Sequence, residues 1–193
     1  MRFESLYERP PSWDVPQPQP AFVARHEAGE IRGTVLDAGC GTGENALYLA
    51  AQGRAVWGLD VALPAIGQAR AKAAARGLPA GRFLLGDALR LEALGLTFDT
   101  IIDSGLVHAL CDRERALYVP SLARALRPGG LYHVLCFSDE QPGDEGPRRV
   151  RRDEVRGAFA PGWRVRRIEP ARFVTRIHPG GARAWCATIE RAG

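Results

Sequence analysis

The sequence predicts an α/β fold in which helices cover both faces of a mostly parallel sheet. Strand-like and helix-like segments alternate through most of the chain with no internal repeat, as they do in proteins built from strand–helix–strand units. The length of 193 residues and the hydrophobic content of 46% are enough for one core and small for two. The last part of the chain breaks the alternation with two strand-like segments in succession, which predicts an antiparallel pair at one edge of the sheet.

The chain is expected to begin with an arm and then enter a single domain, residues 21–193. Five prolines within residues 1–20 restrict the backbone to extended or turn conformations, so we expect no helix there. The elements predicted next are a helix over 21–30, a strand over 34–38, a helix over 44–52, a strand over 55–60 and a helix over 62–76. Gly77 is the expected stop of the last helix, because glycine readily adopts the left-handed conformation that ends helices.

The second half continues this order before the pattern changes. The elements predicted there are a strand over 82–86, a strand over 98–103, a helix over 113–126, a strand over 131–137, a helix over 150–159, and strands over 163–168 and 183–189. Pro128-Gly129-Gly130 is expected to separate the helix from the strand that follows, because proline cannot continue a helix. The last two strands alternate apolar and polar residues, as half-exposed strands do.

Charge and cysteine content argue against several classes of partner. The net charge is +4, and the surplus of basic residues falls after residue 137, which predicts no continuous basic face and no nucleic-acid partner. No apolar run reaches the roughly 18 residues that span a bilayer, and the N-terminus lacks the pattern of a secretory signal. We therefore expect a cytoplasmic protein without a membrane partner. The four cysteines are far apart, which predicts reduced thiols and no metal site.

A glycine-rich segment follows the first predicted strand. In Val35-Leu36-Asp37-Ala38-Gly39-Cys40-Gly41-Thr42-Gly43 the three glycines lack a Cβ, so the backbone can turn tightly and bring its amides against a ligand. The next helix would add the positive end of its dipole. A dinucleotide site would place a pyrophosphate here, but Glu44 puts a negative charge at that position. The segment predicts a flat polar cofactor other than a dinucleotide.

Three carboxylates stand at the ends of successive predicted strands. Asp37 precedes the first glycine and favours a ligand with an ammonium or sulfonium group. Asp60 closes the second strand, at the spacing where an acid accepts hydrogen bonds from ribose hydroxyls. Asp87 follows the third strand and could accept from an adenine amine while the Ala88 amide donates to the ring. Three strand ends would thus hold three parts of one molecule.

These motifs, in this order and spacing, resemble those of the class I S-adenosylmethionine (SAM)-dependent methyltransferases. The matching segments are VLDAGCGTG at 35–43, GLD at 58–60, GDA at 86–88, FDTIIDSG at 98–105 and LRPGG at 126–130. The resemblance implies a three-layer, Rossmann-like fold whose seven-stranded, mostly parallel sheet has one antiparallel strand near the edge. It also implies that SAM is the cofactor and lies over the glycine loop.

The resemblance further implies a role for each matched residue. Around the methionine portion of SAM would lie Asp37, Gly39, Gly41 and Gly43; Asp60 would bind the ribose, Val61 one face of the adenine, and Asp87 and Ala88 the adenine edge; Asp103, with Ser104 and Gly105, would lie beside the reactive methyl group.

The arm carries a narrower resemblance. The Trp-Asp and Gln-Pro pairs within residues 12–20 are similar to the arm of methyltransferases that act on thiols, halides, thiopurines and chalcogen oxyanions such as tellurite, although Val15-Pro16 stands where that subgroup has a glycine and a basic residue. Trp13 would either close over the cofactor, with its ring against the sulfonium, or anchor the arm on the core.

The nature of the acceptor decides which other residues matter. A neutral alcohol or amine needs a base, and His108 is the best placed histidine, although a packed, structural histidine is the alternative. An acceptor that is already an anion needs only a cation, and Arg148 and Arg149 are the candidates, with a solvated charged loop as the alternative.

We therefore expect a SAM-dependent methyltransferase that acts on a small molecule, such as a thiol, a halide or a chalcogen oxyanion. The alternatives are an O- or N-methyltransferase of a small metabolite that uses His108 as base, and a SAM-binding sensor without catalysis. A nucleic-acid amine methyltransferase is disfavoured, because Asp103-Ser104-Gly105-Leu106 stands where such enzymes have a Pro-Pro-Tyr type of motif.

Overall fold

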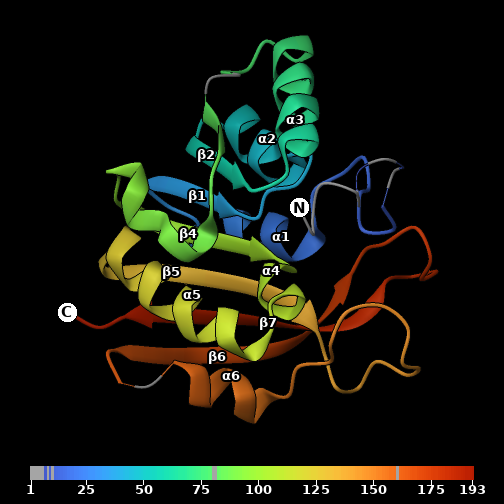
Figure 1. The fold of residues 1–193 in the computed structure, drawn as a ribbon, viewed down its shortest axis with the longest axis vertical. Helices are drawn as coiled ribbons and strands as arrows, with labels where there is room; N and C mark the ends of the chain where they lie inside the picture. Colours follow the sequence, from blue (N-terminus) through green and yellow to red (C-terminus); the bar gives the residue numbers. More distant parts are fainter. Residues whose placement is uncertain (1–6, 8, 10, 80–81, 160) are drawn as a thin grey trace.

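The computed structural model describes residues 7, 9, 11–79, 82–159 and 161–193 and contains a seven-stranded sheet (Figure 1). Its strands, in chain order, are β1 (Thr34–Ala38), β2 (Ala55–Asp60), β3 (Phe83–Leu85), β4 (Phe98–Ser104), β5 (Leu126–Phe137), β6 (Trp163–Phe173) and β7 (Ala182–Arg191). Across the sheet the order is β3-β2-β1-β4-β5-β7-β6. The first five strands are parallel, and β7 runs antiparallel to both of its neighbours. The predicted fold, with one antiparallel strand next to the edge, is confirmed.

Helices cover both faces of the sheet (Figure 1). In chain order they are α1 (Pro20–Glu27), α2 (Glu44–Ala51), α3 (Leu63–Ala75), the 3-10 helix η3 (Ala88–Leu94), α4 (Leu106–Ala109), α5 (Asp112–Ala125) and α6 (Arg152–Ala158). Buried side chains from α1, α2 and α3 form one hydrophobic cluster against the sheet, and those from η3, α5 and α6 contribute to another. Two cores on either side of a sheet are the expected result of its three-layer architecture.

The chain order reverses where β1 pairs with β2 on one side and with β4 on the other. In open α/β sheets a ligand binds outside the carboxyl ends of the strands at such a point. We call the carboxyl ends of β1–β5 and the loops that follow them the strand-end rim. The glycine loop follows β1 and therefore lies at the centre of this rim.

The structure corrects two strand boundaries most clearly. The predicted strand over 163–168 continues to Phe173 in β6. The predicted strand over 131–137 begins earlier, at Leu126, so Pro128-Gly129-Gly130 lies within β5 instead of before it. The pairing with β4 shifts register at this point: Phe98 opposes Leu126, whereas Thr100 opposes Leu131. Such a bulge accommodates a proline, which has no N–H to donate to a neighbouring strand. Two short elements, η3 and α4, were not predicted, because α4 has only four residues and η3 is a 3-10 helix interrupted by the non-helical backbone of Arg90.

No helix among the described residues has the combined length and hydropathy of a membrane span.

Candidate functional site at the strand-end rim

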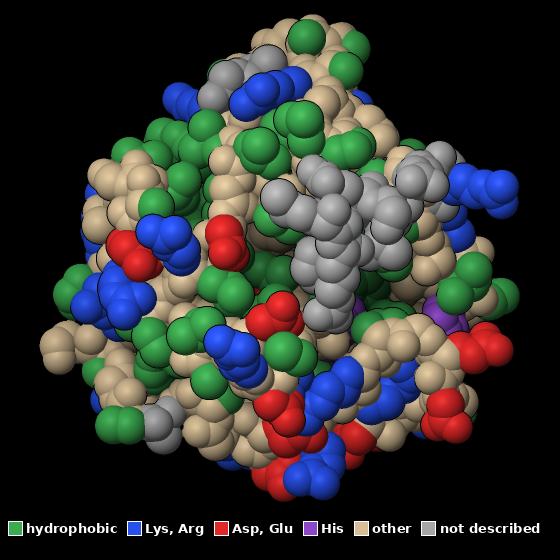
Figure 2. Space-filling model, in the orientation of Figure 1, with side chains coloured by type: hydrophobic (Ala, Val, Ile, Leu, Met, Phe, Trp, Pro, Cys, Tyr) green, Lys and Arg blue, Asp and Glu red, His purple; other side chains and the backbone are tan. Residues whose placement is uncertain are grey.

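The predicted site residues come together at the strand-end rim. Because β1, β2, β3 and β4 are parallel, the carboxylates that follow or close them project from the same edge of the sheet. On the face drawn in Figure 2, hydrophobic side chains gather around a central hollow, and charged side chains of both signs lie around it. In the same orientation, Figure 1 places α4 and the end of β4 close to this hollow. The rim thus combines an apolar hollow with carboxylates.

The glycine loop depends on its glycines. Gly39, Gly41 and Gly43 all have positive φ angles, which residues with a side chain rarely adopt. A Cβ on Gly43 would lie 2.8 Å from the Phe83 ring, and one on Gly39 would lie 3.0 Å from Leu106. The loop therefore packs closely under its neighbours, and substitution of either glycine would displace them.

Asp60 joins the ends of β1 and β2. Its Oδ2 accepts a hydrogen bond of 2.8 Å from the Gly41 amide, and its Oδ1 accepts one of 2.9 Å from the Ala62 amide. Burial raises the pKa of this carboxyl, and the amide donors offset part of the rise. Each carboxylate oxygen can accept a second hydrogen bond, so Asp60 can orient the glycine loop and still bind a hydroxyl.

Asp37 is the least satisfied polar group of the rim. Its side chain is fully buried, and neither carboxylate oxygen has a hydrogen-bond partner among the described residues. Burial, with the nearby Asp103, raises its pKa to about 8. A buried carboxylate without a partner is costly, so this position fits a cationic ligand group such as the ammonium of SAM.

Asp103 faces the α5 layer. Its Oδ2 accepts hydrogen bonds from the hydroxyls of Tyr118 (3.0 Å) and Tyr132 (2.7 Å), and its Oδ1 accepts one of 2.7 Å from the Leu106 amide. Burial raises the pKa of Asp103 to about 6 despite these donors. Asp103 thus holds the start of α4, and a direct contact with the methyl group stays a prediction. Sequence patterns gave no sign of the two tyrosines.

Asp87, Ala88 and Val61 lie where the third and second strands end. The Asp87 side chain is exposed and accepts from the Leu89 amide at 2.8 Å, which caps η3. The Ala88 carbonyl accepts from the Ser121 hydroxyl at 2.8 Å. Val61 is half-buried. The cap uses only one of the two Asp87 carboxylate oxygens. The contacts of these three residues with an adenine stay predictions.

The arm lies against the glycine loop. The Thr42 hydroxyl donates to the Asp14 carboxylate and accepts from Lys72 Nζ at 2.7 Å. The Tyr7 hydroxyl lies 3.1 Å from the position of a Cβ on Gly41, and burial beside Asp60 raises the pKa of Tyr7. Tyr7 was not predicted as a site residue, because nothing in the arm's proline-rich pattern distinguishes it. Thr42 lies in the predicted glycine loop, but no local spacing indicates its contact with the arm.

Trp13 belongs to the same part of the arm. Its side chain is 42% exposed, and its interaction with the Tyr7 hydroxyl works against the rise that burial causes in the pKa of Tyr7. Of the two predicted roles, a ring against the cofactor stays a prediction, and a Trp buried as an anchor is disfavoured by this exposure.

His108 lies on α4 beside an aromatic cluster. Its Nδ1 accepts a hydrogen bond of 2.9 Å from the Phe137 amide, so Nε2 carries the proton of the neutral ring. The ring lies 5.2 Å from Phe137 and 5.7 Å from Phe173, centroid to centroid. Burial, with the nearby Arg149, lowers its pKa to about 3. Of the two alternatives for His108, the geometry favours a packed, neutral hydrogen-bond donor over a general base.

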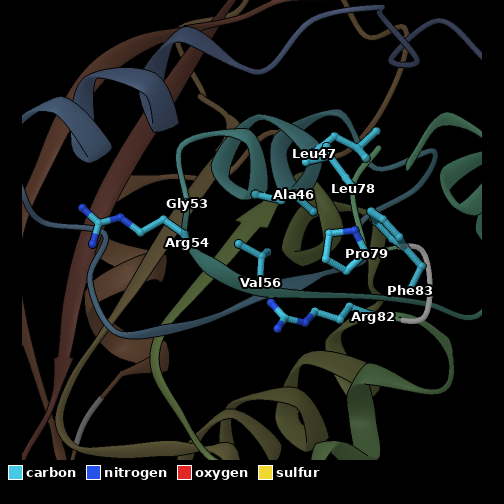
Figure 3. Close-up of a pocket in the computed structure, with 10 residues that line it drawn as sticks. Ala46, Leu47, Gly53, Arg54, Val56, Leu78, Pro79, Arg82 and Phe83 are labelled. Atoms are coloured by element: carbon cyan, nitrogen blue, oxygen red, sulfur yellow. The ribbon is translucent and has the colours of Figure 1, made fainter. Parts of the chain in front are cut away.

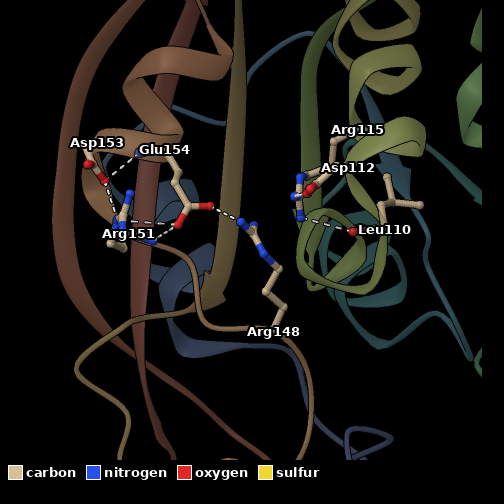
Figure 4. Close-up of polar contacts among 7 residues, drawn as sticks. All are labelled: Leu110, Asp112, Arg115, Arg148, Arg151, Asp153 and Glu154. Atoms are coloured by element: carbon tan, nitrogen blue, oxygen red, sulfur yellow. Dashed lines mark hydrogen bonds and ion pairs between the residues drawn. The ribbon is translucent and has the colours of Figure 1, made fainter.

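The two candidate arginines point to different partners. Arg148 forms an ion pair with Glu154, at the start of α6 (Figure 4). Arg149 instead donates to four backbone carbonyls, those of Gln141 (3.3 Å), Gly143 (2.8 Å), Glu145 (2.9 Å) and Pro147 (2.6 Å). Its guanidinium carbon lies 5.4 Å from the centre of the Phe137 ring. Arg149 therefore organises the loop over 138–150 against the aromatic cluster of Phe137, Phe173 and His108.

A pocket of about 190 Å³ lies elsewhere, between α2, β2 and the segment before β3 (Figure 3). Its apolar lining includes Leu47, Val56 and Phe83. The two arginines at its border have other partners, because Arg54 donates to His26 and Arg82 lies over the Trp57 ring. None of the predicted site residues lines it.

Taken together, a glycine loop after β1, a carboxylate at the end of β2 and a buried carboxylate without a partner define the site of a class I SAM-dependent methyltransferase. Comparison with known proteins places the chain within that class. It belongs to the methyltransferase domain family, whose model matches residues 35–130.

Two relatives span nearly the whole chain. The 2-heptyl-1-hydroxyquinolin-4(1H)-one methyltransferase of Mycobacteroides abscessus is 40% identical over 98% of this chain and 85% of its own length. A solved structure described in "Conversion of a Disulfide Bond into a Thioacetal Group during Echinomycin Biosynthesis" is 38% identical, with a TM-score of 0.89 over 99% of this chain and 91% of that chain.

A more distant relative is the probable thiol methyltransferase 2 of Arabidopsis thaliana, 29% identical over 77% of this chain and 66% of its own length. The magnesium protoporphyrin IX methyltransferase of Synechocystis, solved with bound SAM, shares the fold at 20% identity, with a TM-score of 0.69 over 90% of this chain and 77% of that chain. The chain is therefore a SAM-dependent methyltransferase.

Proposed function

We propose that this methyltransferase acts on an oxygen or sulfur atom of a small molecule, and that this atom is already an anion when it meets the cofactor. The observation that carries the proposal is the state of His108. Its acceptor nitrogen is occupied by the Phe137 amide, and its pKa of about 3 leaves it neutral at physiological pH. A histidine in this state donates a hydrogen bond and does not remove a proton.

The cofactor site would be formed by the residues that close β1 and β2. The unpartnered carboxylate of Asp37 would bind the ammonium of SAM, and Asp60 would accept from the ribose hydroxyls. Bound SAM supplies an activated methyl group and its own leaving group. The protein's share of the catalysis is then to hold the acceptor in line with that methyl group and to exclude water.

Arg149 would supply the positive charge that an anionic acceptor needs. No carboxylate among the described residues pairs with it, and the carbonyls that it binds leave its net charge in place. The same guanidinium lies over the Phe137 ring. That ring in turn contacts the rings of Phe173 and His108. An acceptor with a flat, apolar body and a charged oxygen or sulfur would match this combination. Arg148 is the poorer candidate, because Glu154 already neutralises it.

The relatives support both acceptor atoms. One acts on a hydroxyquinolone, whose name gives an N-hydroxyl on a flat ring, and another is a probable thiol methyltransferase. The arm that resembles the thiol, halide and tellurite subgroup agrees with an acceptor that needs no base. We therefore rank N-hydroxy heterocycles and aromatic thiols first, ahead of iodide, selenite and tellurite.

The test is a methyl-transfer assay with product identification by mass spectrometry on this panel, with neutral alcohols and amines as comparison. We expect turnover on acidic hydroxyls or thiols. The variant His108→Gln should keep activity within about tenfold, whereas removal of a general base costs about 10²–10⁴-fold. Loss on that larger scale, or turnover confined to neutral amines, would contradict the proposal.

Arg149→Ala should raise KM for the acceptor at least about tenfold, the effect of losing one charge-assisted hydrogen bond, while the affinity for S-adenosylhomocysteine stays unchanged. Arg156→Ala, an exposed arginine of α6, is the matched control. Tight binding of SAM with no turnover on any acceptor would instead favour the sensor.

A further inference from the structure

Gln19, the last residue of the arm, is bonded to two distant parts of the protein. It is 3% exposed although it precedes α1 in a proline-rich stretch. Its backbone amide donates a hydrogen bond of 2.8 Å to Asn45 Oδ1, at the start of α2 and directly after the glycine loop. The arm is therefore fixed to the helix that begins at the cofactor site.

The Gln19 side chain binds the hairpin between β6 and β7. Its Nε2 donates to the Val174 carbonyl at 3.0 Å, and its Oε1 accepts from the Val174 amide at 2.8 Å. One carboxamide thus pairs with both backbone groups of a residue 155 positions away, as a neighbouring strand would. Burial makes both bonds hard to replace with water.

Arg176, two residues further along the hairpin, makes the second set of bonds to the arm. Its amide donates to the Ser12 carbonyl at 2.7 Å, and its Nε donates to the Asp14 carbonyl at 2.6 Å. The Asp14 carboxylate in turn accepts from Thr42 in the glycine loop. We call the bonds of Ser12, Asp14 and Gln19 to Val174 and Arg176 the clasp.

Val174, the first hairpin residue of the clasp, directly follows Phe173. Phe173 belongs to the proposed acceptor side of the site. The Phe173 ring lies 5.3 Å from Phe137 and 5.7 Å from His108, and a Cβ on Gly105 would lie 3.2 Å from it. One connected path of bonds therefore runs from the glycine loop through the arm to the wall of the acceptor site.

From this path we infer that Gln19 is a positioning residue that couples the two halves of the site: binding of the cofactor on the glycine loop tightens the clasp and thereby fixes Phe173 against Gly105 and His108. The inference concerns the order in which the site is built and does not depend on which acceptor is used. Because coupling is reciprocal, a bound acceptor strengthens cofactor binding by the same factor.

Two amides of the clasp report its state directly. The Val174 and Arg176 N–H groups exchange with solvent when their bonds to Gln19 and Ser12 open. The experiment is amide hydrogen exchange, read by mass spectrometry on peptides covering 174–178, with and without S-adenosylhomocysteine. We expect exchange at 174–178 to be at least about fivefold slower with the ligand, which is the lower end of typical coupling factors. The ligand itself would bind at the glycine loop, away from these amides.

Gln19→Met removes the paired bonds and keeps the length of the side chain. In this variant the ligand should still slow exchange around 39–45 but should lose its effect on 174–178. Gln68→Met, an exposed position on α3, is the control and should behave as the unsubstituted protein. Arg176→Met, in a loop outside both cores, provides a second variant should Gln19→Met fail to fold.

Three outcomes would overturn the inference. Exchange at 174–178 that is equally slow with and without ligand would show a purely structural clasp. Exchange that the ligand slows to the same extent in Gln19→Met and Arg176→Met would show that coupling follows another route. A ligand effect confined to 39–45 in the unsubstituted protein would show that the two halves are independent.

Discussion

Among single residues, Asp37 is the clearest case of a group that would favour cofactor binding and lower the stability of the ligand-free fold. In an unfolded chain its pKa is about 3.9, and in the folded protein burial raises it to about 8. The folded state therefore holds a proton that the unfolded state has released over that window. Stability is lost as pH rises from about 4 to about 8, because the buried carboxylate must then ionise without a partner.

Asp37→Asn should remove this pH dependence. At pH 8 the ligand-free variant should unfold at a higher temperature than the unsubstituted protein, by about 2–4 °C for each kcal/mol regained. Its affinity for SAM should fall, because the ammonium loses its carboxylate. Thermal unfolding at pH 6 and pH 8, together with calorimetric titration, provides the measurement. Identical pH dependence of Tm in the two proteins would mean that Asp37 is not the titrating group.

Asp60→Ala should weaken S-adenosylhomocysteine binding by about 1–3 kcal/mol, because the ribose would lose charge-assisted hydrogen bonds and the Gly41 amide would lose its acceptor. Calorimetric titration measures the change. Asp112→Ala, whose side chain is 90% exposed, is the control and should bind normally. Unchanged affinity in Asp60→Ala would exclude Asp60 from the cofactor site.

Gly105→Ala tests the close contact between Gly105, which follows β4, and the proposed acceptor wall of His108 and Phe173. Gly105 has a φ of +88°, and the added Cβ would lie 2.9 Å from His108 Nε2 and 3.2 Å from Phe173. Gly162→Ala is the control, because Gly162 has a φ of +86° with nothing within 4 Å. Both variants should lose about 1–3 kcal/mol of stability through backbone strain, and only Gly105→Ala should also lose turnover. Equal activity of the two would show that the contact has no catalytic role.

At the scale of the elements, the sequence predicted best where a periodic pattern met a clear boundary. The first two predicted strands, 34–38 and 55–60, have the bounds of β1 and β2, since each apolar run ends at a carboxylate or a glycine turn. The predicted start of β5 at residue 131 was wrong, because Pro128 lies at a bulge within the strand. A proline more often ends an element than lies inside one. Local pattern does not distinguish these two uses of proline.

The two proposed halves of the site also differ in how much of them the sequence predicted. The proposed cofactor side lies in short motifs at successive strand ends, so the sequence alone could suggest Asp37, Asp60 and the glycine loop as candidates. The proposed acceptor side contains Phe137 and Phe173, and Gln19 joins it to the arm; their contacts link segments far apart in the chain. Such contacts follow from how the strands are ordered in the sheet, which no local spacing reveals.

The arm, as an element, should be separable from the sheet. Of residues 1–18, those that the structure describes belong to neither hydrophobic core and to no strand, so the shortened protein should keep its far-ultraviolet circular dichroism and unfold cooperatively. Its affinity for S-adenosylhomocysteine should fall, because Asp14 and Tyr7 no longer cover the glycine loop. A shortened protein that does not fold, while Trp13→Ala does, would show that the arm belongs to the core.

On the scale of the whole molecule, the cofactor is expected to be a large part of the protein's stability. A ligand at 100 times its Kd stabilises the folded state by about 2.7 kcal/mol, which corresponds to a rise in Tm of about 5–10 °C for a domain of this size. Thermal unfolding with increasing S-adenosylhomocysteine tests this. The rise should be much smaller in Asp60→Ala at the same ligand concentration, and an equal rise would indicate binding elsewhere.

The position of β7 has a consequence for how the protein is made. β7 is synthesised after β6 but lies between β6 and β5. A nascent chain that has emerged only as far as the loop between β6 and β7 therefore has no partner for β6, and the edge of β5 stays open. Translation that pauses in this loop would present two unpaired strand edges to other nascent chains, so this is the stage of synthesis at which aggregation or capture by a chaperone is most favoured.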